Sequence, residues 1–300
     1  MKRISWTALP VLLALAPASN AQSVGYEEAL RAATSDQPQV RTSELRLEAR
    51  REIADAADEL PDPRLRAGVQ NLPVGGPAAF ELGRQLPTQI QIGIEQEIPN
   101  LAKRRARFGM ADADIDLAAA QLRQTRYRVR VGAGMAWISL AYAQQALTVA
   151  DDALTEIEGL VPLARSSVSA GSARPAESLE IRRAVLEVED MRTKIEADRE
   201  AAQAMLSRYT ALTNAIATGT TPSPDLDPEG LRASLQSNPE LVVALAQVRQ
   251  AEARSDLARS ERRPDFGVNV SYGRRDPDFG DVVSVMGSIT LPIFADRRQN

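Results

Sequence analysis

One stretch of the sequence constrains the fold more than any other, because it reads as a single helix too long for a compact globule. Pro162 is the only proline between Leu101 and Leu163. Large residues and mostly small residues form two interleaved series of period seven: Leu101, Phe108, Ile115, Leu122, Val129 and Ala136, and Ala111, Ala118, Thr125, Gly132 and Ser139. This pattern lets helices pack closely. At about 1.5 Å per residue, the helix is a rod of roughly 90 Å.

The rod is expected to fold back on itself as a hairpin. A turn is predicted at 164–178, where Gly171 and Pro175 break the helical pattern. A second, shorter helix with a mixed-charge exposed face follows the turn. The sequence therefore predicts a long antiparallel helical hairpin over 100–213, ended by a proline-rich linker at 217–230.

Four short runs carry a different pattern, in which apolar and polar residues alternate. They cover 63–73, 88–99, 264–273 and 282–292. Alternation gives a strand one apolar face, which packs on a soluble core or faces lipid in a membrane barrel. Lipid is favoured because the runs are long enough to cross a bilayer as tilted strands, and the long helices offer no second layer. The predicted lipid-facing residues are Ile90, Ile92, Ile94, Phe266, Val268, Val270, Tyr272, Val285 and Ile289.

The strand pairs lie in two stretches that repeat one plan, which predicts an internal duplication. Prolines align in order between the two stretches: Pro38 with Pro239, Pro63 with Pro264, and Pro99 with Pro292. Each stretch predicts a helix, at 27–60 and at 239–262, followed by a strand pair. We expect repeat 1 to occupy 22–216, and repeat 2, at 231–300, to lack its hairpin. The chain is therefore expected to be incomplete by about a hundred residues.

The N-terminus has the features of a cleavable signal peptide over 1–21. Lys2 and Arg3 precede an apolar core too short to span a bilayer, and Ser19 and Ala21 are the small residues before the expected cleavage site. No cysteine follows this site, so we expect no lipid anchor. Cleavage would take the net charge from −4 to −6, because the segment carries two basic residues. Such an acidic exported chain is not expected to bind nucleic acid.

Composition also narrows the chemistry. The chain has no His and no Cys, which removes the usual zinc, copper and iron–sulfur ligands and the Cys–His and Ser–His–Asp nucleophiles. Catalysis by carboxylates alone stays open. However, the acidic clusters at 59–63 and 274–281 are rich in residues that favour turns. We therefore expect no enzymatic activity, no cofactor and no metal site.

In the order of its parts, the mature chain resembles the TolC-like outer-membrane efflux channels. The similarity is carried by "QPQV" (37–40) and "NPEL" (238–241) at helix starts, by strands that begin with proline, and by "VSAG" (168–171) at the hairpin tip. It is also carried by the strand-to-helix junctions "IPNLAKRR" (98–105) and "LPIFADRR" (291–298). The chain looks most similar to the branch that serves heavy-metal and cation efflux.

The resemblance implies a mainly helical fold with transmembrane strands and a homotrimer, in which each protomer contributes four strands to a twelve-stranded outer-membrane barrel. The helices would form a tunnel through the periplasm. The hairpin tip, with Arg165, Val168, Ala170 and Gly171 as the matching residues, would meet a periplasmic adaptor protein and so connect to an inner-membrane transporter. No cofactor is implied, because the pump supplies the energy. The strand residues above would contact outer-membrane lipid.

Two other functions are consistent with the same pattern. A periplasmic adaptor also combines a helical hairpin with β structure, although the duplicated strand pairs argue against it. A type I secretion channel for polypeptides would share the whole architecture, since fold does not fix function. The transported substrate, whether a metal ion, a drug or a polypeptide, is not encoded in any motif found here.

Overall fold

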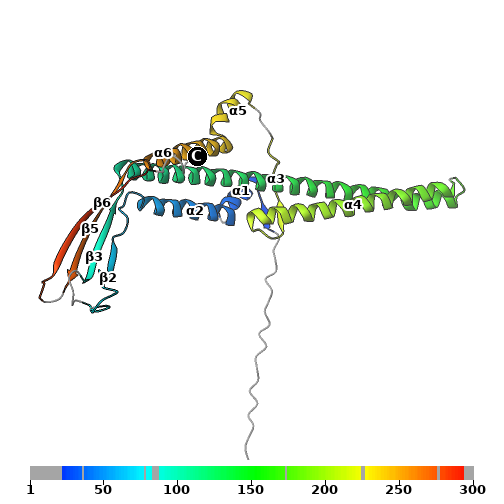
Figure 1. Cartoon of the computed structure of the whole chain (residues 1–300). Helices are drawn as coiled ribbons and strands as arrows, with labels where there is room; N and C mark the ends of the chain where they lie inside the picture. The colour runs from blue at the N-terminus through cyan, green and yellow to red at the C-terminus, as the bar shows by residue number, and fades with distance from the viewer. Residues whose placement is uncertain are drawn as a thin grey trace, which may run out of the picture. The chain divides into compact units, whose positions relative to one another are not determined.

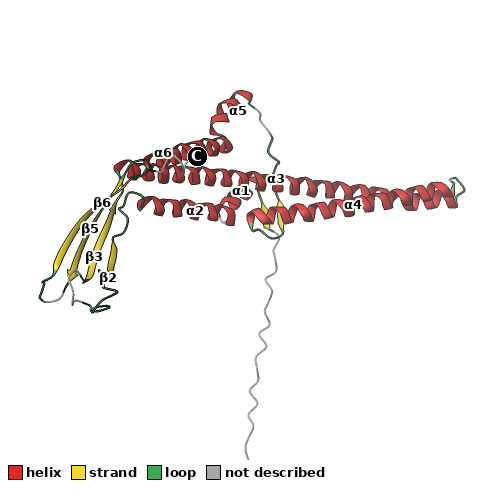
Figure 2. Cartoon of the chain, viewed as in Figure 1, coloured by secondary structure: helices red, strands yellow, loops and turns green. Residues whose placement is uncertain are grey.

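The computed structural model describes residues 22–35, 37–77, 79–82, 88–172, 174–223, 227–275 and 278–293. The predicted signal peptide (1–21) and residues 294–298 of the second junction, "LPIFADRR", lie outside these ranges. The described chain is mainly helical, with a four-stranded and a two-stranded sheet (Figure 1 and Figure 2). It divides into two compact units, and helix α3 (Leu101–Ser169) contributes residues to both.

The first unit has its core around Trp137 of α3. Both Trp137 and Leu206 are fully buried. The Trp137 indole N–H donates to the carbonyl of Val24 over 2.8 Å, and the ring of Tyr26 meets the indole edge-on, with centroids 5.4 Å apart. The elements of this unit are β1 (Gln22–Val24), α1 (Tyr26–Ser35), the part of α3 from Arg126, α4 (Pro175–Thr210) and β4 (Ala215–Ala217).

Strands β1 and β4 form a small parallel sheet that the sequence analysis did not predict. Gln22 lies opposite Ala215, and Val24 lies opposite Ala217. Three residues are too few for alternation to be recognised against the background sequence. Together with the Trp137 hydrogen bond, this pairing ties the first described residues to the end of the hairpin.

The prediction of one continuous helix over 27–60 was wrong. Helix α1 ends at Ser35, and α2 (Pro38–Asp55) starts anew. A residue before proline is disfavoured in the helical region, whereas proline suits the first position of a helix. The buried side chain of Gln37 lies at this break and contacts the end of α4. Its amide nitrogen donates to the carbonyls of Arg208 and Tyr209, each at 2.7 Å, at the end of α4.

In the second unit, α2 and α6 pack on the first part of α3. Asp114 of α3 accepts hydrogen bonds from Arg50 of α2, at 3.4 Å, and from Gln250 of α6, at 2.6 Å. Ala120 is buried against Val243 and Ala246. The elements of this unit are α2 from Gln39, β2 (Arg64–Gln70), β3 (Gln89–Ile98), α3 up to Thr125, α5 (Pro228–Ser234), the 3-10 turn η1 (Leu235–Ser237), α6 (Pro239–Ser260), β5 (Asp265–Arg274) and β6 (Val282–Thr290).

The four-stranded sheet is antiparallel throughout, in the order β2-β3-β5-β6 (Figure 1). Three of its strands fall within the alternating runs predicted from the sequence, and β5 extends one residue beyond its run, to Arg274. The central pair joins the two predicted repeats, since Ile94 of β3 lies opposite Val270 of β5. For this reason the compact units cross the predicted repeat boundaries rather than follow them.

Two further boundaries differ from the sequence prediction. Helix α3 passes through Pro162 and ends at Ser169, and α4 begins at Pro175, so most of the turn expected at 164–178 is helical. The linker predicted at 217–230 ends early, because α5 begins at Pro228. The side chain of Asp227 caps α5 by accepting the backbone N–H groups of Glu229 and Gly230, both at 3.0 Å.

Candidate functional site

The pairing register of the sheet brings all nine residues predicted to face lipid onto one face. Ile92 lies between Ala67 and Tyr272 across the strands, and Val270 lies opposite Val285. The nine side chains are between 40% and 70% exposed, and the described residues place no second layer over them. The sheet therefore presents an unpartnered apolar face.

Sequence reasoning missed the contribution of β2 to this apolar face. Leu65 and Val69 lie on it, opposite Ile94 and Ile90, and Leu65 is 70% exposed. Their signal was present as the alternation in "RLRAGVQ" (64–70), but two arginines and a glycine on the other face weakened it. Ile98 and Val283 also belong to the apolar face.

The opposite face of the sheet is polar and internally hydrogen-bonded. The side-chain amide of Gln91 donates to the hydroxyl of Ser271 at 2.5 Å, that of Gln89 donates to Gln70 at 2.5 Å, and Arg66 forms an ion pair with Glu95. All of these side chains except Gln89 line a cavity of about 500 Å³, together with Asn269, Ser288 and the apolar side chains of Ala67, Val69 and Met286. The two faces thus differ in chemistry as the lipid side and the water side of a membrane-barrel wall do.

Glycines on the polar face place no side chain between its long polar side chains. A Cβ added to Gly93 would come within 2.7 Å of the Cβ of Ser271, which is closer than real side chains approach. Gly68 and Gly273 flank Gln91 across the strands. Small residues at these positions leave room for the neighbouring polar side chains and for the cavity between them.

The outer edges of β2 and β6 have no strand partner among the described residues. The backbone N–H and C=O groups along such edges need partners, and an unpaired edge cannot face hydrocarbon. The sheet of one chain is therefore an open segment rather than a closed barrel.

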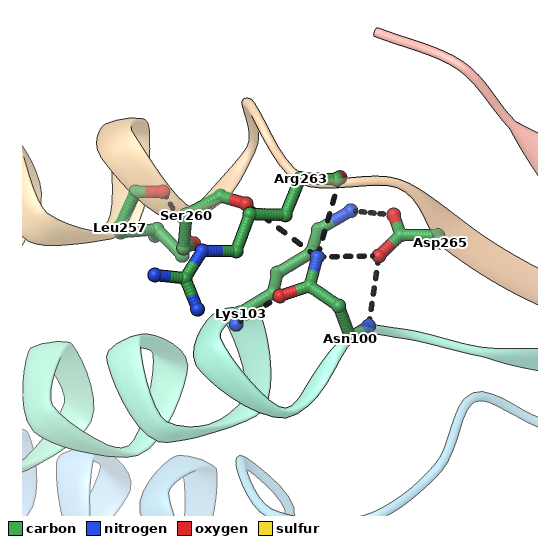
Figure 3. Close-up of polar contacts among 6 residues, drawn as sticks. All are labelled: Asn100, Lys103, Leu257, Ser260, Arg263 and Asp265. Atoms are coloured by element: carbon green, nitrogen blue, oxygen red, sulfur yellow. Dashed lines mark hydrogen bonds and ion pairs between the residues drawn. The ribbon is translucent and has the colours of Figure 1, made fainter.

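Asn100 fixes the junction between the sheet and α3 (Figure 3). Its Oδ1 accepts the backbone N–H of Lys103 at 2.8 Å and so caps the helix. Its backbone N–H and its Nδ2 both donate to Oδ1 of Asp265, each at 2.9 Å. Nδ2 also approaches the carbonyls of Ser260 and Arg263, at 3.5 and 3.4 Å.

A shielded ion pair completes this junction. Lys103 Nζ lies 2.6 Å from Oδ2 of Asp265, and the two side chains are only 16% and 13% exposed. The pair links the first turn of α3 to the first residue of β5, directly after α6 (Figure 3). The sequence analysis recognised "IPNLAKRR" as a junction, but its partner Asp265 lies 165 residues from Asn100, and pairing at that distance leaves no local pattern.

The turn between β5 and β6 is held by Asp281. Its carboxylate accepts hydrogen bonds from the Tyr272 hydroxyl and the Arg275 backbone N–H, and these bonds lower the pKa of the Asp281 carboxyl. The Arg275 guanidinium in turn donates to the carbonyls of Gly280 and Phe279, at 2.7 and 2.9 Å. This part of the predicted acidic cluster at 274–281 thus stabilises a turn.

The four residues assigned to the hairpin tip lie together at the end of α3. Arg165 and Val168 are helical, Ala170 follows the helix, and Gly171 has a φ of 71°, which suits glycine. Arg165, Ala170 and Gly171 are exposed, and Val168 is half-buried. The backbone N–H of Gly171 donates to the carbonyl of Val168 at 3.1 Å, which closes the turn.

Neither a helical membrane span nor a metal cluster is found in the described ranges. Within them, no helix has both the length and the apolarity that crossing a membrane requires. The same ranges contain no group of three or more acidic, His or Cys side chains that could hold a metal ion.

Comparison with family models matches residues 29–212 to the outer membrane efflux protein family. The chain belongs to this family. The resemblance drawn from the order of motifs is thereby confirmed at the family level. A sequence comparison with curated proteins gave no match.

Solved structures show the same mainly helical fold with a small sheet. The CmeC outer membrane channel of Campylobacter jejuni superposes with a TM-score of 0.71 at 13% identity, over 90% of this chain and 61% of CmeC. VceC of Vibrio cholerae gives 0.69 at 16% identity, over 90% and 68%. MtrE of Neisseria gonorrhoeae gives 0.68 at 17% identity, over 91% and 67%. The chain therefore spans 61% of the length of CmeC.

Proposed function

We propose that the chain is a protomer of an outer-membrane channel in a tripartite efflux system. It would form a passive conduit across the periplasm for substrates delivered by an inner-membrane transporter through a periplasmic adaptor. The observation that carries this proposal is the sheet, which has an exposed apolar face, a polar face and two open edges.

The apolar face supports insertion of the strands into the outer membrane. Ten residues of strand rise about 33 Å, enough to cross the apolar band of about 25 Å in a tilted barrel. The polar face, with Gln91, Ser271 and Glu95, would then line a water-filled lumen. A lumen of this kind needs no catalytic residue and no cofactor, because the pump performs the work.

The open edges support assembly with further copies of the chain. Four strands do not close on themselves in the described structure, and closure is required where edges would meet lipid. Three copies would supply twelve strands, which is the homotrimer that the family resemblance implies. We also propose that the two strand pairs arose by internal duplication, on the strength of the aligned prolines.

The hairpin tip is proposed as the surface that meets the adaptor. Arg165, Val168, Ala170 and Gly171 lie at the far end of the α3–α4 hairpin, and small exposed residues there allow close helix-to-helix contact. A cleavable signal peptide over 1–21, without a lipid anchor, would deliver the chain to the periplasm. The heavy-metal and cation branch is our proposal for the substrate class, on the resemblance alone.

Membrane extraction and conductance together test the proposed function. The chain, expressed with its own N-terminus, should require detergent for release from outer membranes, and should then give discrete conductance steps in planar bilayers. Release by carbonate or high salt, with no conductance, would contradict the channel and favour the periplasmic adaptor. Secretion of a polypeptide in place of small-solute efflux by cells that carry the complete system would favour the type I alternative.

A further inference from the structure

Basic side chains gather at the level where the strands end, although the chain as a whole is acidic. Residues 103–107 contain Lys103, Arg104, Arg105 and Arg107 and no acidic residue, and residues 259–263 contain Arg259, Arg262 and Arg263 with one acid, Glu261. These segments follow β3 and precede β5. The local charge therefore opposes the net charge of −4.

Some of these basic side chains already form ion pairs within the chain. Lys103 is paired with Asp265, Arg104 with Asp58 at 3.1 Å, and Arg259 with Asp256 at 2.9 Å. Among the described residues, no carboxylate forms an ion pair with the guanidinium of Arg105 or with that of Arg263. These two groups therefore remain able to bind an external anion.

Arg105 and Arg263 line one cavity between α3 and α6. It has a volume of about 380 Å³. Arg259 and its ion-pair partner Asp256 also line it, together with Ser260, and the α3 side is otherwise formed by Ala102 and Ala106. Three guanidinium groups therefore face one carboxylate, which leaves the charges of Arg105 and Arg263 in excess. The small alanine side chains leave the cavity open. Guanidinium groups bind phosphate through paired hydrogen bonds, which makes this donor set suited to a phosphodiester.

The distance of the cavity from the strand ends places it at the headgroup layer of a membrane that surrounds the sheet. Arg263 lies two residues before β5, and Arg105 lies four residues into α3. Both are therefore within roughly 10 Å of the strand ends. Lipid headgroups occupy roughly 5–7 Å on each side of the hydrocarbon. The apolar face ends at Ile98 and Phe266, the residues next to this level.

We propose that Arg105, Arg259 and Arg263 form a binding site for the headgroup of an acidic phospholipid in the periplasmic leaflet, with its acyl chains against the apolar face. This inference rests on the membrane insertion proposed above. The site holds one lipid per protomer and fixes the depth of the sheet, because the anion is bound at the junction of strand and helix.

Lipid binding by the full chain in neutral detergent tests the proposal. Native mass spectrometry would count bound dioleoyl phosphatidylglycerol and dioleoyl phosphatidylcholine at low salt. Wild-type protein should prefer phosphatidylglycerol. The Arg105→Gln/Arg263→Gln variant should bind it roughly ten- to thirtyfold more weakly, because two cations close to an anionic headgroup are lost. The Arg105→Lys/Arg263→Lys variant should fall between them, since lysine keeps the charge without the paired hydrogen bonds.

A matched control separates the site from net charge. Arg183→Gln/Arg232→Gln removes two arginines from exposed helical positions, with side chains 81% and 72% exposed, and should bind phosphatidylglycerol like the wild type. Equal binding by the wild type and the Arg105/Arg263 variant would overturn the proposal. Displacement of bound anion by pyrophosphate with no lipid preference would also overturn it, in favour of a soluble phosphate ligand.

Failure of this inference is distinguishable from failure of the proposed function. If the wild-type chain inserts into bilayers and shows no preference for the acidic lipid, only the lipid site is wrong. If the chain does not insert, the channel proposal itself is wrong. Circular dichroism of each variant would show whether it keeps the helical content of the wild type, so a folding defect is recognised directly.

Discussion

At the residue scale, the ion pair at the strand–helix junction makes the sharpest prediction. Replacing Asp265 by Ala leaves the shielded ammonium of Lys103 without its partner and the backbone N–H of Asn100 without its acceptor. Loss of one member of a fully buried pair costs about 3–5 kcal/mol, and an exposed pair contributes about 0–1 kcal/mol. Because this pair is partly buried, we expect Asp265→Ala to lower the free energy of unfolding by an amount between these two ranges, measured by urea denaturation of the folded protein in detergent.

Asp256→Ala is the matched control for this prediction. It makes the same substitution in an ion pair on α6, but Asp256 and Arg259 are 64% and 73% exposed. Exposed pairs contribute about 0–1 kcal/mol, so the change should be small. Equal losses in the two variants would show that shielding of the Lys103–Asp265 pair is not what stabilises the junction.

Gln37 gives a second prediction at this scale. Its side-chain amide donates to two carbonyls at the end of α4. A carboxylate at this position would face both carbonyl oxygens with no proton to donate. Gln37→Glu should therefore destabilise the first unit by about 1–3 kcal/mol at neutral pH. The midpoint of thermal unfolding, followed by circular dichroism, measures the effect. Gln39→Glu, the same change on an exposed neighbour, should not lower that midpoint, because a carboxylate in the first turn of α2 is favoured by the helix dipole. An equal loss there would show that the hydrogen bonds of Gln37 are not the cause.

At the scale of the elements, the two faces of β3 should respond oppositely to the same charge. Ile92 lies on the apolar face, whereas Gln91 lies on the polar face between Gly68 and Gly273. A lysine at mid-membrane on a lipid face costs about 2–4 kcal/mol. Ile92→Lys should therefore reduce the folded fraction in outer membranes sharply, as judged by heat-modifiable mobility in gels, and Gln91→Lys should not. If both variants kept, or both lost, the folded fraction, the assignment of one face to lipid and the other to water would be wrong.

The hairpin tip carries a prediction about partners. Ala170 is exposed at the tip, and a large charged side chain there would prevent close contact with another helix. Ala170→Arg should reduce efflux by cells that express the complete system by about tenfold or more, while the amount of protein in the membrane stays constant. Ala201→Arg, at an exposed position of α4 away from the tip, should leave efflux unchanged. Full efflux by the Ala170 variant would exclude this tip as the docking surface.

The elements that the sequence predicted well are those whose pattern repeats. The strands follow from alternation of period two, and α3 follows from apolar residues at every seventh position. The pairing of β3 with β5 has no such local signal, because its partners lie far apart in the sequence. The same is true of Asp265 and Asn100, whose contact defines the junction.

The helix ends are where prediction from neighbouring residues was wrong. Ser166 and Ser167 lie within the predicted turn at 164–178, but their hydroxyls donate to the carbonyl of Leu163, at 2.8 and 3.0 Å, and so are accommodated within α3. The other wrong prediction was one helix over 27–60. The chain breaks there between α1 and α2 because Gln37 precedes a proline and because its side chain binds α4. The first cause is visible in the sequence, and the second exists only in the folded unit.

At the scale of the whole molecule, one requirement follows from the sheet: its two open edges must meet other chains if the apolar face meets lipid. The chain itself offers a clean way to test this, because it has no cysteine. A cysteine introduced in β2 and another in β6 of the same chain can form a disulfide only where these edges meet.

Oxidative cross-linking of such double-cysteine variants in intact outer membranes tests directly whether three copies close the sheet into a barrel. A small panel would pair Leu65→Cys, Ala67→Cys or Val69→Cys with Val283→Cys or Val285→Cys, since the register between copies is to be found. We predict covalent dimers and trimers, with no higher species, and none from variants with either cysteine alone at β2 or β6. Monomers throughout the panel, or a ladder that continues past the trimer, would contradict a closed barrel of three copies.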